Sequence, residues 1–180
     1  APGQVFWHEN GFIILNELIK FSRELHKKFE YKEILTPFIF DNKLWKISGH
    51  WEHYRDNMFH FTNPRDKDEV LAIKPMNCPG HVEIFKQGLK SFRDLPLRVA
   101  EFGKCHRNEL AGTMHGLMRV RGMQMNDAHI YCTEEQFFDE FKAVIGLYLE
   151  YFRIFGIQKY VMRLSKHSKE NLGKKYINEP

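Results

Sequence analysis

The stretch Glu101–His129, EFGKCHRNELAGTMHGLMRVRGMQMNDAH, decides how this chain folds. It continues an apolar run, Leu95 to Phe102, that predicts a β-strand. Arg107 and Glu109 follow two residues apart, and residues two apart in a strand point to the same face. We therefore expect a guanidinium and a carboxylate on one surface, the cation suited to a phosphate and the anion to an amino group.

A second apolar run, Leu117 to Met125, is expected to pair antiparallel with the first across the connection Leu110 to Met118. Arg119 and Arg121 repeat the spacing of two residues within it. Two strands that bring three arginines and one glutamate together indicate a nucleoside-triphosphate site. On spacing alone, a hairpin with a solvated charged face is the other interpretation.

The residues of this stretch resemble motif 2 of the class II aminoacyl-tRNA synthetases, with Arg107-Asn108-Glu109, a loop and then Arg119. Four further segments narrow the resemblance to the threonyl-tRNA synthetases within that family: SGHW (48–51), KPMNCPGH (74–81), RDLPLR (93–98) and NDAHIYCTEEQ (126–136). Their order and spacing carry the resemblance, which runs from Pro2 to about Pro180.

The pattern of elements predicts an α+β fold built on an antiparallel sheet flanked by helices, because hairpins and helices occur without a βαβ rhythm. Asn10 is expected to cap a helix with an apolar stripe that runs from Phe12 to Phe29. Tyr31 to Thr36 is a predicted strand that Pro37 stops. The resemblance identifies this unit as motif 1, which implies a homodimer interface; an ordinary helix packed on a sheet fits the periodicity equally well.

The remaining elements are predicted from apolar runs, turns and caps. They are a hairpin of 59–61 with 71–73, a helix from Pro79 to Leu89, a helix that Thr133 and Gln136 begin and Gly156 ends, a last strand Ile157 to Leu164, and a polar tail from Ser165 to Pro180. The resemblance implies that the 180 residues are the N-terminal part of one catalytic domain, without motif 3, the editing domain or the anticodon-binding domain.

Composition sets broader limits. A net charge of +4 indicates a mild preference for anionic partners. Three cysteines, Cys78, Cys105 and Cys132, are far apart and without CxxC spacing, which favours a reducing compartment over a disulfide framework. The sequence has no signal peptide and no long apolar run, so we expect a cytoplasmic protein without a membrane partner, although a mature mitochondrial protein has the same features.

The resemblance assigns the nucleotide site. It implies that Arg107 bridges the α-phosphate of ATP and the carboxylate of the amino acid, a catalytic role, and that Glu109 accepts from the adenine amino group. Arg119 would meet the γ-phosphate of ATP bound with Mg²⁺, and Val120 and Met123 would complete the site. Motif 2 normally has a Phe that stacks on adenine where this chain has Met123.

The resemblance also implies a threonine site with zinc, held in the family by one Cys and two His. Cys78 and His129 match the first two metal ligands, while the third lies downstream of this chain. Asp127 matches the carboxylate that receives the threonine hydroxyl, and Met76 lines the pocket. Met125 stands where the family has a Gln that holds the threonine carboxylate; Gln124 would replace it only if a β-bulge displaced the strand. From the residues alone, a buried Cys and a core His are the simpler interpretation.

His50 in SGHW matches a family histidine near the terminal ribose of tRNA, a possible proton acceptor for acyl transfer; an exposed loop histidine is the alternative. The resemblance thus predicts a threonine–tRNA ligase that uses threonine, ATP and tRNA(Thr), with weak or absent activity in the isolated chain. A non-enzymatic interaction or dimerisation module derived from the same fold is the competing hypothesis. An enzyme for another amino acid is disfavoured, because Cys78, Asp127 and His129 all match the threonine pocket.

Overall fold

The computed structural model describes residues 2–88 and 91–165. The chain divides into two compact units after Val144, and each is described by itself. Among the described residues, the first unit holds two three-stranded sheets and the helices up to the first half of the last one. Within the described ranges, no helix is both long enough and apolar enough to span a bilayer.

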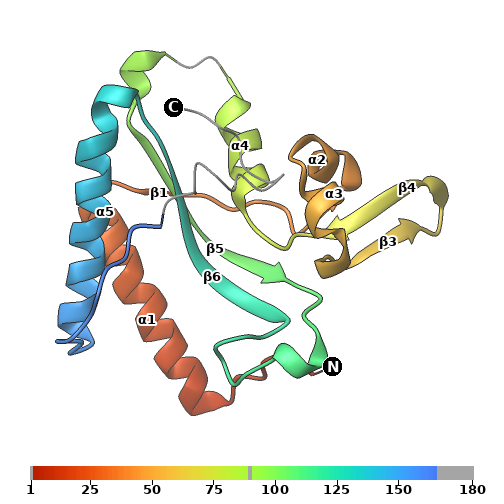
Figure 1. Ribbon diagram of the computed structural model, residues 1–180, viewed down its shortest axis with the longest axis horizontal. Helices are drawn as coiled ribbons and strands as arrows, with labels where there is room; N and C mark the ends of the chain where they lie inside the picture. The colour runs from red at the N-terminus through yellow and green to blue at the C-terminus, as the bar shows by residue number, and fades with distance from the viewer. Residues whose placement is uncertain (1, 89–90, 166–180) are drawn as a thin grey trace. The chain divides into compact units, whose positions relative to one another are not determined.

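The larger sheet is built on the long pair of strands β5 (Leu97–His106) and β6 (Gly122–Tyr131) (Figure 1). They run antiparallel in unbroken register, from Leu97 opposite Tyr131 to His106 opposite Gly122. The predicted antiparallel pairing is therefore confirmed, although both strands lie a few residues away from the expected bounds. On its other side β5 pairs in parallel with the short strand β1 (Lys32–Glu33).

The second sheet has the order β2 (Ile39–Asp41), β4 (Asp66–Ile73), β3 (His60–Asn63), and both pairs are antiparallel. The predicted hairpin is thus confirmed. Helices α2 (Asn42–Ile47) and α3 (His50–Tyr54) and the 3-10 turn η1 (Arg55–Asn57) fill the connection between β2 and β3 (Figure 1). Trp45, Met58 and Ala72 form a buried apolar cluster there, which fixes this connection against β4.

Helix α1 (Glu9–Lys28) begins one residue before the expected cap. His8 takes the N-cap position and Asn10 lies inside the first turn, so the predicted cap is wrong; the acidic Glu9 favours the positive end of the helix dipole. Leu25 of the predicted stripe is buried, but Phe12 is 52% exposed. Residues of α1 share a cavity with Phe102, Gln124 and Asn126, so α1 lies against that face of β5 and β6.

Helix α4 (Cys78–Lys86) follows the segment Lys74 to Asn77 and begins with proline in its first turn, as predicted. Two other 3-10 turns, η2 (Phe92–Asp94) and η3 (Ala111–Thr113), lie before and after β5.

The long helix α5 (Glu134–Ile154) begins where the capping pattern predicts it. The Thr133 backbone N–H donates to Gln136 Oε1 at 3.0 Å. Gly156 ends the helix with a left-handed φ of 68°, which glycine adopts without strain. The predicted strand from Ile157 to Leu164 is wrong, because those residues are exposed and have no strand partner in the part of the chain that the structure describes. The tail after Ser165 lies outside the described residues.

Candidate functional site

One face of β6 carries the predicted amino-acid site. Along this strand the side chains alternate between half-buried and exposed, as the period of two requires. The half-buried positions include Met123, Met125, Asp127 and His129, so four predicted site residues share one face. The unbroken register of β5 and β6 excludes the β-bulge that would have moved Gln124 onto this face. Gln124 is exposed and faces α1 with Phe102, so the condition for Gln124 to replace the family glutamine is not met.

These four residues of β6 pair with four residues of β5 on the same face of the sheet. The β5 residues are Val99, Glu101, Gly103 and Cys105, and all of them are buried. Asn77, just before α4, is fully buried over Gly103 and donates to Asp127 Oδ2 at 3.1 Å. A Cβ atom on Gly103 would lie 2.2 Å from Asn77 Oδ1. Glycine at this position therefore lets Asn77 approach the strand and hold the Asp127 carboxylate.

Glu101 lies at the centre of a buried polar cluster, which we call the Glu101 cluster and which consists of Thr36, Lys74, His81 and Glu101. The Lys74 ammonium donates to Glu101 Oε1 at 2.7 Å, and His81 Nε2 lies 2.9 Å from Glu101 Oε2. The backbone N–H of Thr36 donates to Oε1 at 3.1 Å, and the hydroxyl of Thr36 donates to Oε2 at 2.9 Å. A buried charge is tolerated only when it is paired and hydrogen-bonded, and this carboxylate is both.

The partners of Glu101 decide its ionisation. Burial by itself raises the pKa of this carboxyl group, but the hydrogen bonds from His81, Lys74 and Thr36 outweigh it and lower the pKa to about 2. Glu101 is therefore ionised at neutral pH and serves as an acceptor only.

The Glu101 cluster reaches the predicted metal ligands through a second histidine. His129 Nδ1 lies 2.8 Å from His81 Nδ1, and the two rings meet edge to face. Burial lowers the pKa of His129, and the proximity of His81 lowers it further while Asp127 raises it. Cys78 is close enough to Asp127 that, after burial, this carboxylate is the next cause that raises the pKa of the thiol. Cys78, Asp127 and His129 are thus brought to one region.

Cys78 and His129 offer the thiolate and imidazole donors that zinc accepts. However, residues 2–88 and 91–165 contain no group of three or more His, Cys, Asp or Glu side chains placed to hold a metal ion. The two donors fit part of a zinc site, and further donors would have to come from substrate, water or residues outside these ranges.

The predicted nucleotide residues lie at the far end of the same strand pair. Arg107 and Glu109 follow the end of β5, and Arg119 precedes β6, so the expected placement within strands is wrong. The pairing continues for one more bond, from Arg107 N–H to Arg121 O at 2.8 Å, and Arg121 Nε donates to Glu109 O at 2.9 Å. The backbone therefore turns beyond the regular strand pair, and this turn brings the side chains of Arg107, Glu109 and Arg119 together.

The side chains of this arginine end are held more loosely. Arg107 Nε donates to Pro75 O at 3.1 Å, which ties it to the segment before α4. An Arg119 guanidinium nitrogen lies 3.9 Å from Glu109 Oε2, at the limit of an ion pair, and the Arg119 side chain is 57% exposed. Val120 is buried beside it. Arg107, Glu109 and Arg119 are thus close together with cationic groups left for a ligand.

His50 lies at the start of α3 and has local contacts, with Nδ1 2.8 Å from Ser48 Oγ and the ring 5.9 Å from that of Trp45. Burial lowers its pKa, and the contact with Ser48 opposes that effect. The described contacts do not link His50 to Arg107 or Cys78. Met76 is half-buried in the segment between Lys74 and α4.

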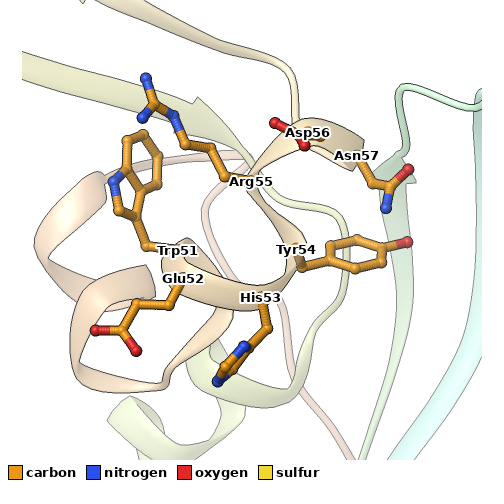
Figure 2. A pocket seen from close by; sticks show the side chains of 7 residues that line it. All are labelled: Trp51, Glu52, His53, Tyr54, Arg55, Asp56 and Asn57. Carbon is orange, nitrogen blue, oxygen red and sulfur yellow. The ribbon is translucent and has the colours of Figure 1, made fainter. Parts of the chain in front are cut away.

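A cavity of about 290 Å³ lies along α3 and η1, lined by residues 51–57 (Figure 2). The Arg55 guanidinium lies 5.0 Å from the centre of the Trp51 ring, and Figure 2 shows these two side chains together on one side of the segment. Asn108 of motif 2 joins this segment, because its backbone N–H donates to Asn57 O at 2.9 Å and its side chain to Asp56 O. The cavity is therefore next to the arginine end of β5.

Sequence reasoning missed the Glu101 cluster and Asn77. One signal was present in the sequence. Glu101 lies inside the apolar run LPLRVAEF, and a charged residue in a run that is expected to be buried indicates a buried partner. Lys74 likewise follows directly after the apolar end of β4. Two opposite charges in buried positions predict an internal pair, although their partner choice needs the three-dimensional register.

Comparison with known proteins gives a consistent result. The family model described as tRNA synthetase class II core domain (G, H, P, S and T) matches residues 59–178. A crystal structure described as the RNA-binding domain of threonyl-tRNA synthetase from Cryptosporidium parvum Iowa II is 45% identical, with a TM-score of 0.79, over 85% of this chain and 38% of that chain. A putative threonyl-tRNA synthetase, ThrRS-1, from Aeropyrum pernix is 34% identical, with a TM-score of 0.72, over 81% of this chain and 31% of that chain.

A third structure, Giardia lamblia prolyl-tRNA synthetase in complex with prolyl-adenylate, shares the fold at 23% identity, with a TM-score of 0.73 over 82% of this chain and 30% of that chain. The chain spans about a third of the length of these solved structures. The predicted α+β fold with the class II arrangement is confirmed.

Proposed function

The chain belongs to the class II aminoacyl-tRNA synthetase family, as motif 2 predicted, and from this we propose that it is the N-terminal part of the catalytic domain of a threonine–tRNA ligase. The observation that carries the proposal is the division of the predicted site residues into two groups along β5 and β6. Arg107, Glu109 and Arg119 lie at one end of the pair. Asp127 and His129 lie toward the other end, beside Cys78.

This division matches the two substrates of amino-acid activation. A carboxylate oxygen of threonine attacks the α-phosphorus of ATP, and pyrophosphate leaves with the electron pair of the broken P–O bond. The step needs positioning and the neutralisation of phosphate charge more than proton transfer. Arg107 lies at the arginine end, and its Nε donates to Pro75 O, in the segment that leads to Cys78. We assign Arg107 to the carboxylate and α-phosphate together.

The other nucleotide contacts follow from chemistry and position. Glu109, a carboxylate, would accept from the adenine amino group, and Arg119 would meet the γ-phosphate of ATP with its Mg²⁺. Met123, on the half-buried face of β6, would lie against the purine in place of an aromatic ring, and Val120 would pack beside it. Glu109 and Met123 are half-buried and Arg119 is exposed, whereas Val120 is buried and would support the site by packing.

The amino-acid contacts use the other end of β6. Asp127, oriented by Asn77, would accept from the threonine hydroxyl, and Met76 and Met125 would line the pocket. Cys78 and His129 would hold zinc, which when bound supplies coordination for the amino and hydroxyl groups and so separates threonine from valine. His50 would accept the proton of the tRNA ribose hydroxyl during transfer to tRNA(Thr).

Binding of a non-reactive adenylate analogue tests the proposal on the chain as it exists. Calorimetry with threonyl-, seryl- and valyl-sulfamoyl adenosine should show saturable binding with threonyl the tightest. Arg107→Ala should weaken threonyl-analogue binding by about 10- to 100-fold, because a charged hydrogen bond contributes roughly 1.5–3 kcal/mol. Arg65→Ala, on the turn between β3 and β4, is the matched control and should bind like the original chain.

Absence of saturable binding by any of the three analogues, in a folded chain, would overturn the proposal. Equal affinity for the threonyl and valyl analogues would overturn the amino-acid assignment while keeping the family. An ATP–pyrophosphate exchange assay with threonine gives the further expectation of weak or absent turnover, since the chain spans about a third of the structures that it matches.

A dimerisation module is the second candidate, and exposed apolar residues of α1 favour it: Phe12, Ile13, Ile14 and Leu18 are between 39% and 62% exposed. Sedimentation of the original chain and of Ile14→Glu would show whether this surface mediates a homodimer. Dimers without any analogue binding would select this candidate over the ligase. Glu17→Gln on the same helix is the control. Cytoplasmic localisation is part of the ligase proposal and is tested by fractionation of cells that express the chain.

A further inference from the structure

Two histidines, the buried His81 and the half-buried His129, are in contact through the Nδ1 nitrogens of their rings. His81 Nδ1 and His129 Nδ1 lie 2.8 Å apart, with ring centres 4.7 Å apart and planes at 76°. A hydrogen bond between two nitrogens needs one N–H donor and one bare acceptor. The direction of this bond therefore decides which nitrogen of His129 carries its hydrogen.

The other nitrogen of His81 supplies the direction. Glu101 receives hydrogen bonds from the Lys74 ammonium and from the Thr36 backbone N–H, neither of which can accept. The Thr36 hydroxyl accepts from Lys74 at 2.7 Å, so its own hydrogen is directed to Glu101 Oε2 at 2.9 Å. A carboxylate surrounded by donors leaves His81 Nε2, at 2.9 Å, with one role, that of a donor.

We propose that Glu101 and His81 are positioning residues that fix the tautomer of His129 and keep its Nε2 lone pair free for a ligand. His81 carries hydrogen on Nε2 and is bare at Nδ1. His129 then donates from Nδ1, and its Nε2 nitrogen on the opposite edge of the ring is unprotonated. The inference rests on the proposed function only in naming the ligand, a zinc ion or a polar group of the amino acid.

Burial makes this relay specific. The side chains of His81 and Glu101 are 0% exposed, so water does not compete for the shared bonds. Three elements hold the partners, with His81 on α4, Glu101 on β5 and His129 on β6. Histidines that bind metal through one nitrogen are commonly oriented by a hydrogen bond from the other. Here the hydrogen bond from His129 goes to a second histidine, His81, and His81 is itself oriented by its hydrogen bond to the Glu101 carboxylate.

Nitrogen-15 NMR of the histidine rings in the metal-free chain tests the proposal directly. Long-range proton–nitrogen correlations distinguish a bare ring nitrogen from one that carries hydrogen. We expect His129 as the Nδ1–H form and His81 as the Nε2–H form at neutral pH. A His129 found mainly as the Nε2–H form, or a His81 ring with hydrogen on both nitrogens, would overturn the proposal without any variant.

Two substitutions of His81 separate positioning from simple packing. His81→Gln retains an N–H group for Glu101 and an oxygen for His129, so His129 should keep the Nδ1–H form. His81→Leu fills the space without either group, and the single tautomer of His129 should be lost. If His81→Leu left the tautomer of a folded chain unchanged, the relay would be wrong. His115→Gln, in the loop before β6, is the matched control.

Glu101→Gln gives an independent reading. Lys74 and the Thr36 N–H need an oxygen at the Oε1 position, so the amide NH₂ takes the Oε2 position and donates to His81. His81 then carries hydrogen on Nδ1, and His129 should change to the Nε2–H form as its major tautomer. An unchanged His129 in folded Glu101→Gln would contradict the proposal. Because no substrate or metal is used, failure here leaves the ligase assignment to be judged by analogue binding alone.

Discussion

Two regions of the β5–β6 pair, the Glu101 cluster near its middle and the arginine end, show opposite ways to place charged groups. At the Glu101 cluster the charges are buried, and every donor is matched to an acceptor at 2.7–3.1 Å. At the arginine end, Arg119 and Glu109 are 3.9 Å apart and the arginine is largely exposed. Glu101 thus forms its hydrogen bonds with other protein groups, whereas the Arg119 guanidinium remains largely exposed to solvent.

This difference has an energetic reason. A buried carboxylate without partners would lose its hydration and gain no hydrogen bonds. Removal of any partner in the cluster should therefore lower the free energy of unfolding. A solvent-exposed arginine needs no protein partner, because water solvates its charge. We therefore expect substitutions at the Glu101 cluster to change stability strongly and substitutions at the arginine end to change it little.

Glu101→Leu should have the largest effect, a loss of about 3–5 kcal/mol in the free energy of unfolding, because it leaves the Lys74 ammonium buried without its partner. Urea denaturation at neutral pH measures it. Glu83→Leu on α4 is the control, since within residues 2–88 and 91–165 its ion pair is the exposed one with Lys86, and it should change stability by less than about 1 kcal/mol. Similar losses for both variants would remove the contrast between buried and exposed charges.

Acid should weaken the same cluster by roughly 3 kcal/mol. The pKa of Glu101 is lowered from 4.5 to about 2 in the folded chain, so its stabilisation is complete above pH 4.5 and is lost as the pH falls toward 2. Urea denaturation at a series of pH values measures the slope. The slope should be shallower in Glu101→Gln than in the original chain, and equal slopes would show that another carboxyl group governs acid unfolding.

Gly103→Ala should cost about 1–3 kcal/mol, because the added methyl group would lie 2.2–2.6 Å from the Asn77 amide and must displace it. The Asn77–Asp127 hydrogen bond should be lost with it, visible as a changed Asn77 side-chain amide signal in NMR spectra. Gly112→Ala has open space around its Cβ and should change stability by less than about 0.5 kcal/mol. If both substitutions were neutral, Asn77 would not be packed against the strand.

The sequence alone supports the family, the antiparallel pair and the hairpin, because these depend on local patterns and on motif spacing. The predicted run ends at Met125, so the common face of Met123, Met125, Asp127 and His129 follows only from the longer strand β6 in the structure. Sequence reasoning fails where a contact joins distant segments. The bond between His81 and His129 joins residues 48 apart in sequence, and the bond between Thr36 and Glu101 joins residues 65 apart.

The other failures have local physical reasons. The spacing of Arg107 and Glu109 predicts strand positions. However, the regular register ends at His106, only one further bond joins the Arg107 N–H to Arg121 O, and the Glu109 N–H donates back to Arg107 O. The run from Ile157 to Leu164 is apolar enough for a strand, but a strand needs a partner, and those described residues have none. Gln124 could be placed only once the register was known.

The smallest effect is expected for the pair Glu109 and Arg119. A double-mutant cycle with Glu109→Gln and Arg119→Gln should give a coupling of about 0.2–1 kcal/mol in urea denaturation, as for exposed ion pairs. The coupling should decrease further when the ionic strength is raised from about 0.01 M to 1 M, because salt screens exposed charges. A salt-independent coupling above about 2 kcal/mol would mean that the arginine end is as tightly organised as the Glu101 cluster. In that case a nucleotide could bind only after the Glu109–Arg119 ion pair was broken, and the contrast between the Glu101 cluster and the arginine end would be wrong.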